Sequence, residues 1–187
     1  MDFTVFPTGL GWMAVAGANR VIAGVALPAE DMGAAMDGLC MKLRLPSDSL
    51  HEVEPGVFGT LVERLTAYMR GEPVIFCDSL DTSGWTDFRS RVWNAARLIP
   101  YGQTRSYSWV AAAAGQPRAS RAVGQAMHFN PVPILVPCHR VIGANKSLTG
   151  FGGGLALKQQ LISLESTSLA TQTTRYEASA SMSDNSC

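Results

Sequence analysis

Hydrophobic and small or polar residues alternate along the first part of the chain. The alternation has a period of two and falls into two runs: Trp12, Ala14 and Ala16, then Val21, Ala23 and Val25. Glycine-containing segments at residues 9–11 and 17–19 interrupt it with turn-forming residues. Such a pattern is typical of half-buried strands joined by tight turns. It predicts an antiparallel β-meander between Phe3 and Pro28.

The spacing changes to a helical period further along. An acidic, irregular stretch follows the predicted strands, and the next apolar stripe consists of Leu61, Leu65, Tyr68 and Met69. It stops at Gly71, just before Pro73, as helices commonly do. The tyrosine is interpreted as part of this stripe. We therefore expect residues 1–80 to form a small N-terminal α/β domain with an antiparallel sheet.

The second half of the chain reads as a series of short helices. Residues 87–98 carry an apolar side that consists of Phe88, Val92, Trp93 and Ala96, with Ile99 beyond them. Thr86 and Ser106 are candidate N-caps, and Gly115 ends a helix that begins after Ser106. A second helix is expected over residues 116–127, with Pro117 in its first turn. Two short helices joined at a glycine indicate a helix-turn-helix.

These patterns together predict an α+β protein. A mainly helical C-terminal domain spans residues 81–165 and ends with a helix from Leu155 to Leu164 that stops at Glu165. Ten of the residues from Ser166 to Cys187 are Ser or Thr, and apolar periodicity disappears there. We expect residues 166–187 to be a disordered tail.

Composition narrows the class of protein. The chain has 187 residues, of which 47% are hydrophobic, so it can bury a core. No basic leader precedes the first apolar residues, and no apolar run approaches a membrane span. The four cysteines have no close spacing, which favours a reducing compartment over a disulfide scaffold. We expect a soluble protein without a membrane partner, cytoplasmic in a bacterium or nuclear in a eukaryote.

The net charge of zero hides an asymmetry. Residues 1–80 contain five Lys or Arg and ten Asp or Glu, giving −5, whereas residues 81–165 contain nine and three, giving +6; the tail adds −1. A basic half suits a nucleic-acid partner, because neutralised phosphates release counterions. Charge alone fits a solvated basic face equally well.

A proline-rich stretch from Asn130 to Val141 carries the candidate chemistry. Its three prolines exclude an ordinary helix, and it ends in Cys138, His139 and Arg140. A reactive cysteine needs a basic or cationic neighbour, because the free thiol has a pKa of about 8.5. A small buried cysteine is the alternative interpretation. No metal is predicted, because zinc needs four ligands, no second pair is suitably spaced, and Cys40, His51 and Cys77 are only loosely spaced.

The motif resembles a known family. Asn130-Pro131-Val132-Pro133-Ile134, then Pro137-Cys138-His139-Arg140-Val141, then Gly152-Gly153-Gly154-Leu155 are similar to the active-site signature of the O6-alkylguanine-DNA alkyltransferases. The similarity runs in order from about Phe88 to Glu165. It implies a monomer that acts on double-stranded DNA containing O6-alkylguanine, transfers the alkyl group irreversibly to itself, and uses no cofactor.

The resemblance also implies roles for single residues. Cys138 would accept the alkyl group, with His139 as its base acting through a water and Glu165 orienting the histidine. Tyr107 would donate a hydrogen bond to the base ring. Arg121 would enter the DNA stack in place of a flipped-out base. A recognition helix with small surface residues would fit the minor groove through Ala119, Ser120, Ala122 and Gly124.

The implied substrate pocket combines side chains and backbone. Pro133 and Phe151 would line it, the backbone at Cys138, Val141 and Gly152 would contact the base edge, and Asn130 would tie the recognition helix to the active-site turn. Many relatives have Tyr in place of Phe151 and Ser in place of Gly152, which leaves the tolerance for bulkier alkyl groups open. Activity on O4-alkylthymine is a separate open point.

Three rival functions are compatible with parts of this sequence. A lesion-binding relative without transfer activity lacks the acceptor, so Cys138 argues against it. A helix-turn-helix regulator that senses alkylation would need a dimerisation element or a sensor domain, and neither is found. A cysteine hydrolase would differ by repeated turnover on an acyl substrate.

Overall fold

The N-terminal part is a four-stranded sheet in the order β3-β2-β1-β4. A computed structural model describes residues 1–183, with side-chain surroundings up to residue 168. The predicted meander is present as β1 (Asp2–Thr8), β2 (Gly11–Ala18) and β3 (Val21–Val25). The predicted antiparallel pairing is confirmed for β1, β2 and β3, and β4 (His51–Glu52) adds a short strand parallel to β1, so the complete sheet is mixed. β4 has only two residues, both exposed, so it is too short to show an alternating pattern in the sequence.

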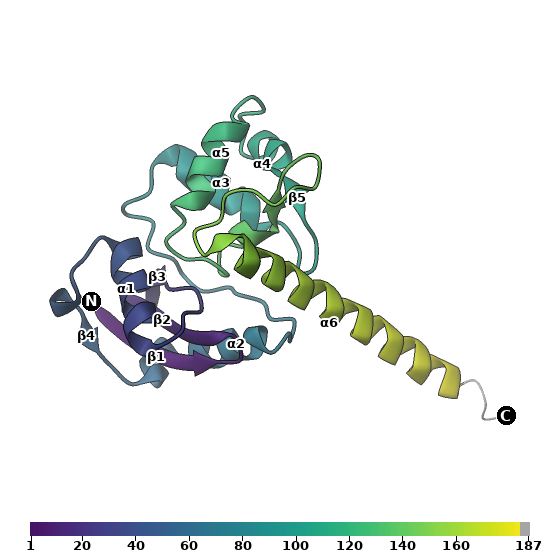
Figure 1. Ribbon diagram of the computed structural model, residues 1–187, viewed down its shortest axis with the longest axis horizontal. Coiled ribbons are helices and arrows are strands. Elements are labelled where there is room, and N and C mark those ends of the chain that lie inside the picture. The colour runs from purple at the N-terminus through teal and green to yellow at the C-terminus, as the bar shows by residue number, and fades with distance from the viewer. Residues whose placement is uncertain (184–187) are drawn as a thin grey trace.

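Helices cover both faces of this sheet (Figure 1). α1 (Met32–Leu43) packs on one face through Ala35 and Leu39, which are fully buried. The sequence pattern does not reveal α1, because its two glycines and two alanines weaken the apolar stripe in a segment interpreted as irregular. Its start is nonetheless well capped, since the Asp31 carboxylate accepts a hydrogen bond from the Ala34 amide at 2.8 Å.

α2 (Leu61–Met69) covers the opposite face and was predicted correctly. The helical part then contains α3 (Asp87–Arg97), α4 (Tyr107–Ala113) and α5 (Ser120–His128). The predicted caps are confirmed: Thr86 accepts from the Arg89 amide at 3.3 Å and Ser106 from the Trp109 amide at 3.1 Å. α5 starts later than predicted, because residues 117 and 118 form a turn.

A short parallel pairing joins β5 (Arg105–Ser106) to β6 (Val141–Ile142). It holds the segment after Cys138 against the start of α4. α6 (Gly154–Ser183) follows, and in place of the predicted disordered tail from Ser166 the helix runs on through Ser183. No Gly or Pro lies between Leu155 and Ser183 to end it. Its C-terminal half extends away from the rest of the molecule (Figure 1), and residues 184–187 of the predicted tail lie outside the described residues.

One hydrophobic core joins the two parts. The largest buried cluster includes Leu61 and Leu65 of α2, Trp93 of α3 and Leu161 of α6. Backbone contacts reinforce it, since the Val25 amide of β3 donates to the Pro131 carbonyl at 2.9 Å. The proline-rich stretch is therefore packed between the sheet and the helices. None of the helices described up to Ser183 is long and apolar enough to cross a membrane.

Because the core is shared, a cavity on the sheet side should weaken both parts. Leu65→Ala is expected to lower the free energy of unfolding by about 2–5 kcal/mol. Urea unfolding followed by tryptophan fluorescence and by far-UV circular dichroism would check this. Leu98→Ala, the same change at a side chain that is 70% exposed, should stay within about 0.5 kcal/mol of the wild type. Two separate transitions, with only one shifted by Leu65→Ala, would contradict a shared core.

Candidate active site

The proline-rich stretch places Cys138 at the start of a short 3-10 turn, η3 (Cys138–Arg140). Every residue from Val132 to Ile142 is buried. Ile134 has a positive φ of 75°, and the Cys138 amide donates to the Val136 carbonyl at 2.8 Å. The prolines keep this segment from forming a helix. The thiol is thereby held in a tight, buried bend, and Cys138 is only 4% exposed.

Asn130 links this bend to the end of α5. Its side-chain amide donates to the Val136 carbonyl at 2.8 Å and to Cys138 Sγ at 3.2 Å, while its Oδ1 accepts from the Val132 amide at 3.0 Å. The bond to sulfur adds to the tethering role that the family resemblance implied. A donor aimed at sulfur favours the thiolate over the thiol.

Burial nevertheless raises the pKa of the Cys138 thiol above its usual value. The Asn130 hydrogen bond and the positive charges of Lys42 and Lys158 act in the opposite direction. The thiol of the resting protein is therefore protonated, and a base must remove its proton before it can act as a nucleophile.

Two lysines that sequence reasoning missed lie near the thiol. Lys42 of α1 donates to the Asn130 carbonyl at 3.2 Å. Lys158 of α6 is fully buried and donates to the carbonyls of Val141 at 2.6 Å and Thr149 at 3.0 Å. Burial lowers the pKa of Lys158 to about 8. Neither lysine stands in a motif, so only the fold could identify them.

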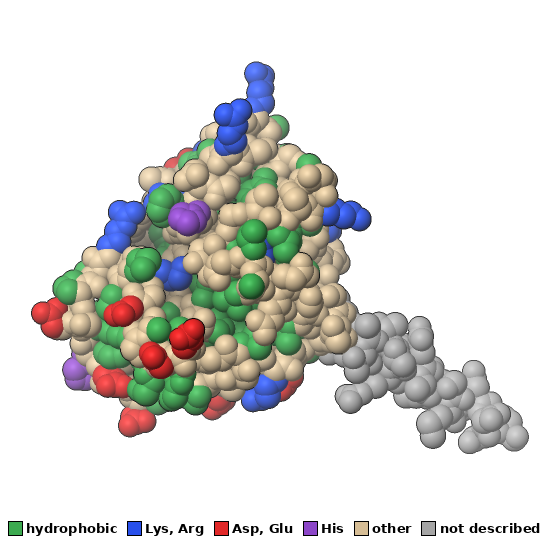
Figure 2. Space-filling model, viewed as in Figure 1, with side chains coloured by type: hydrophobic (Ala, Val, Ile, Leu, Met, Phe, Trp, Pro, Cys, Tyr) green, Lys and Arg blue, Asp and Glu red, His purple; other side chains and the backbone are tan. Residues whose placement is uncertain are grey.

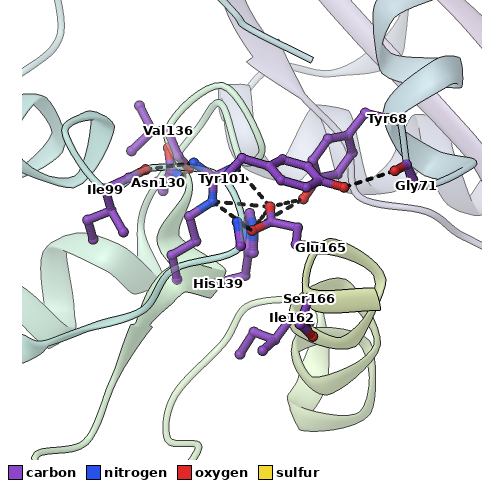
Figure 3. A network of polar contacts seen from close by, with 12 residues as sticks. Tyr68, Gly71, Ile99, Tyr101, Asn130, Val136, His139, Ile162, Glu165 and Ser166 are labelled. Atoms are coloured by element: carbon purple, nitrogen blue, oxygen red, sulfur yellow. Dashed lines mark hydrogen bonds and ion pairs between the residues drawn. The ribbon is translucent and has the colours of Figure 1, made fainter. Parts of the chain in front are cut away.

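His139 points to Glu165 in the centre of a buried polar network (Figure 3). Its Nε2 lies 2.8 Å from Glu165 Oε1, and the imidazole is fully buried. Burial lowers the pKa of His139 in spite of the neighbouring carboxylate, so the imidazole is neutral at pH 7. Within the part of the chain with described side chains, His139 Nδ1 is the only buried side-chain nitrogen or oxygen that has no hydrogen-bond partner.

Glu165 is bound on both oxygens. Arg140 Nε lies 3.1 Å from Oε1 and 3.0 Å from Oε2, and the Gly102 amide donates to Oε2 at 2.8 Å. Burial opposes ionisation, but the hydrogen bonds from His139 and Arg140 outweigh it and lower the pKa of Glu165 to about 2. The three consecutive residues of η3 thus divide between two partners: Cys138 contacts Asn130, and the next two contact Glu165.

Tyr68 of α2 also enters this network. Its hydroxyl donates to Glu165 Oε1 at 2.6 Å and lies 3.1 Å from His139 Nε2. The sequence placed Tyr68 on an apolar stripe, which is correct for its ring, but no pattern indicated a partner for its hydroxyl. A buried tyrosine hydroxyl usually has such a partner.

Tyr107, one of the predicted site residues, is the first residue of α4. Tyr107 is half-buried; its hydroxyl donates to the Thr149 carbonyl at 2.9 Å and lies 3.5 Å from Lys158 Nζ. Pro133, Val141 and Phe151 are buried, whereas Gly152 is exposed. A Cβ added to Gly152 would meet only the His128 carbonyl at 3.7 Å, so a serine fits there. At Gly153 it would lie 2.7 Å from a terminal methyl group of Leu27, so that side chain would have to shift.

α5, the predicted recognition helix, presents its small residues at the surface. Arg121 and Ala122 are exposed, and Ala119, Ser120 and Gly124 are partly exposed. Its buried side consists of Val123, Ala126 and Met127. In Figure 2, Lys and Arg protrude mainly from the upper, helical part, and acidic side chains gather over the sheet. No cluster of three or more potential metal ligands occurs among the described residues.

Comparisons with known proteins agree with this geometry. Residues 87–167 match the family described as "6-O-methylguanine DNA methyltransferase, DNA binding domain". The methylated-DNA–protein-cysteine methyltransferase of Mycobacterium tuberculosis is 47% identical over 132 residues, which are 71% of this chain and 79% of the relative. The inducible enzyme of that name from Bacillus subtilis is 47% identical over 65% of this chain and 67% of its own length.

A solved structure covers more of the chain. The crystal structure of Mycobacterium tuberculosis OGT in complex with DNA has a TM-score of 0.75 and 38% sequence identity, covering 90% of this chain and 94% of that one. The similarity therefore includes the N-terminal sheet as well as the helical part.

Removing the charge of Glu165 should destabilise the protein, because Arg140 would be left buried without a counter-charge. Glu165→Gln is expected to cost about 3–5 kcal/mol at neutral pH. The pKa of Glu165 is about 2 in the folded chain, against an ordinary 4.5. Its stabilisation is therefore present above about pH 4.5 and is lost as the pH falls toward 2. Urea unfolding across this range should show a shallower pH dependence for the variant.

Glu72→Gln is the matched control, because Glu72 pairs with Arg70 at the surface, where both side chains are more than half exposed. It should leave stability nearly unchanged. Equal effects of the two substitutions would contradict the central place of Glu165.

Proposed function

Because the chain belongs to the methylated-DNA–protein-cysteine methyltransferase family, we propose that Cys138 is the cysteine that takes a methyl group from O6-methylguanine in DNA. The protein repairs DNA by this direct transfer to itself. The main support for Cys138 as the acceptor is its surroundings. The buried thiol accepts a hydrogen bond from Asn130, and the next residue is a neutral histidine whose Nδ1 has no partner among the described residues.

The transfer is a displacement at a saturated carbon. The Cys138 proton passes to His139 Nδ1, through a water, and the sulfur lone pair forms the new S–CH₃ bond. The O6–CH₃ bond breaks, and its electron pair stays on guanine O6. The ionised Glu165 stabilises the imidazolium that forms. Because the product is a thioether with no leaving group, each molecule acts once, and the transfer needs no cofactor.

Departure of the purine requires stabilisation of its negative charge. Tyr107 is placed between the helix-turn-helix and the pocket loop, with Lys158 Nζ 3.5 Å from its hydroxyl. A phenol beside an ammonium group is a good donor, so we assign Tyr107 the hydrogen bond to the guanine ring, made in exchange for its bond to the Thr149 carbonyl. Pro133, Val141, Phe151 and the backbone at Gly152 would enclose the base.

Access to the methyl carbon requires the nucleotide to leave the double helix. Extrusion costs a few kcal/mol, which protein contacts must offset. We assign the replacement of the extruded base to Arg121, which is exposed on α5 among the small residues Ala119, Ser120, Ala122 and Gly124. A flat guanidinium can stack and hydrogen-bond in the space left by the base, and small neighbours let the helix approach the minor groove. The protein would act as a monomer on double-stranded DNA, in a reducing compartment such as the bacterial cytoplasm.

The acceptor can be identified by intact-mass spectrometry after mixing with a duplex that carries one O6-methylguanine. The wild type should gain one methyl group on the peptide that contains Cys138, with one lesion repaired per protein molecule. Cys138→Ser should gain none while still binding DNA. Cys77→Ser, at an exposed thiol, should react like the wild type. A methyl group on another peptide, or repeated turnover, would refute the assignment.

Arg121→Ala should slow repair of duplex DNA by about 10- to 100-fold, because the few kcal/mol of extrusion lose their compensation. The same variant should react nearly normally with O6-methylguanine in single-stranded DNA, where no partner base must be replaced. Single-turnover rates on the two substrates would measure this. Arg70→Ala removes one positive charge from the sheet side and serves as the control for charge. An equal loss on both substrates would argue against a role in base extrusion.

A further inference from the structure

We propose that Tyr68 is a positioning residue for methyl transfer, which acts through His139 and Glu165 from the N-terminal part of the chain. The inference rests on the proposed function of Cys138 and His139. Tyr68 comes from α2, far in sequence from the motif. Its hydroxyl contacts both the proposed base, His139, and the carboxylate that orients this base, Glu165 (Figure 3).

The direction of the hydrogen bonds follows from the donors available. A phenol has one proton, and at 2.6 Å from Glu165 Oε1 the Tyr68 hydroxyl donates it to the carboxylate. Toward His139 Nε2, 3.1 Å away, the same oxygen can then only accept. Glu165 Oε1 is also an acceptor at 2.8 Å from this nitrogen. Two acceptors at Nε2 require its hydrogen to be there, so the lone pair lies on Nδ1.

This arrangement selects the tautomer that the reaction needs. Nδ1 is the ring nitrogen without a partner among the described residues, and it is the nitrogen that must take the proton of Cys138. Tyr68 does not exchange its own proton in this step. It supplies a donor that keeps Glu165 ionised and an acceptor that holds the imidazole plane.

Packing fixes the Tyr68 hydroxyl in place. The side chain is fully buried, and its ring makes edge contacts with Phe76, Tyr101 and His139 at centroid distances of 5.9, 6.0 and 6.4 Å. Burial and the nearby Glu165 charge raise its pKa well above the ordinary value. The group is therefore a neutral donor throughout the physiological range and contributes no titration of its own.

Other charged and titratable groups face the site of Cys138 and His139 from the elements packed around it. All of these groups are unchanged in a variant that loses only the Tyr68 hydroxyl. They are Lys42 of α1, Tyr101 before α4, Tyr107 of α4, Arg140 of η3, and Lys158 and Glu165 of α6. Tyr68→Phe thus changes the hydrogen bonding of His139 and Glu165 while it keeps the surrounding charges and the aromatic packing.

The test is the single-turnover rate of methyl transfer with saturating DNA, measured from about pH 6 to about pH 9.5. At neutral pH, Tyr68→Phe should be about ten-fold slower than the wild type, at the lower end of what acid–base catalysis contributes. The difference should narrow as the pH rises, because hydroxide then ionises the Cys138 thiol without help from His139. DNA affinity should not change.

Tyr101→Phe is the matched control. It removes a hydroxyl from the neighbouring ring, and with it a hydrogen bond of 3.1 Å to the Gly71 carbonyl across the same boundary between sheet and helices. Its rate should stay close to that of the wild type. A pH-independent loss in Tyr68→Phe, a loss of the same size in Tyr101→Phe, or no loss in Tyr68→Phe would each overturn the inference.

A second readout separates this inference from the proposed function. The rate at which iodoacetamide alkylates Cys138 in free protein needs no DNA, and Tyr68→Phe should slow it most at neutral pH. A wild type that fails to accept methyl from DNA but shows this pH-dependent difference would refute the proposed function alone. Normal methyl transfer by the wild type, with identical iodoacetamide profiles for the two proteins, would refute the role of Tyr68 alone.

Discussion

The Glu165 carboxylate is the group on which the site's geometry depends. It is 1% exposed, and an ionised carboxylate at that depth is stable only when hydrogen bonds and opposite charge replace its water. Its donors come from segments far apart in the chain: Tyr68 of α2, Gly102 after α3, and His139 with Arg140 in η3. The hydrogen bonds to this one carboxylate therefore hold these elements in place against α6. In the resulting turn, Cys138 lies on the side that faces Asn130.

The same burial explains why the thiol can be both protected and reactive. Desolvation keeps Cys138 protonated and His139 neutral, so the resting pair carries no charge that would have to be stabilised. Charge develops only when the proton moves, and then Asn130, Lys42 and Lys158 surround the sulfur with donors and positive charge. An acceptor that reacts once gains from being unreactive until its substrate is bound.

Local patterns predicted the local structure well. The alternation of apolar residues located the β-meander, and the apolar stripe of α2 predicted that helix. The N-caps Thr86 and Ser106 could be predicted because their hydroxyls accept hydrogen bonds from amides three residues further along the chain. The failures have physical causes. In α1 the two glycines hide a helix that tertiary contacts stabilise, and β4 is too short for any period. The grouping of Cys138, His139 and Glu165 came from family resemblance, since residues 26 apart carry no signal of contact by themselves.

No sequence pattern predicted the contacts that Tyr68 and Lys42 make in the site. These contacts show that the N-terminal part contributes directly to the site. Its acidic composition and the predicted boundary at residue 80 indicated a domain separate from the candidate chemistry. In the fold, α1 supplies a lysine to the Asn130 carbonyl and α2 supplies a hydroxyl to Glu165. Buried residues of the sheet and of the active-site turn also belong to one hydrophobic cluster. The electrostatics of the site are therefore a property of the whole fold, and the C-terminal motif alone lacks two of the groups that determine them.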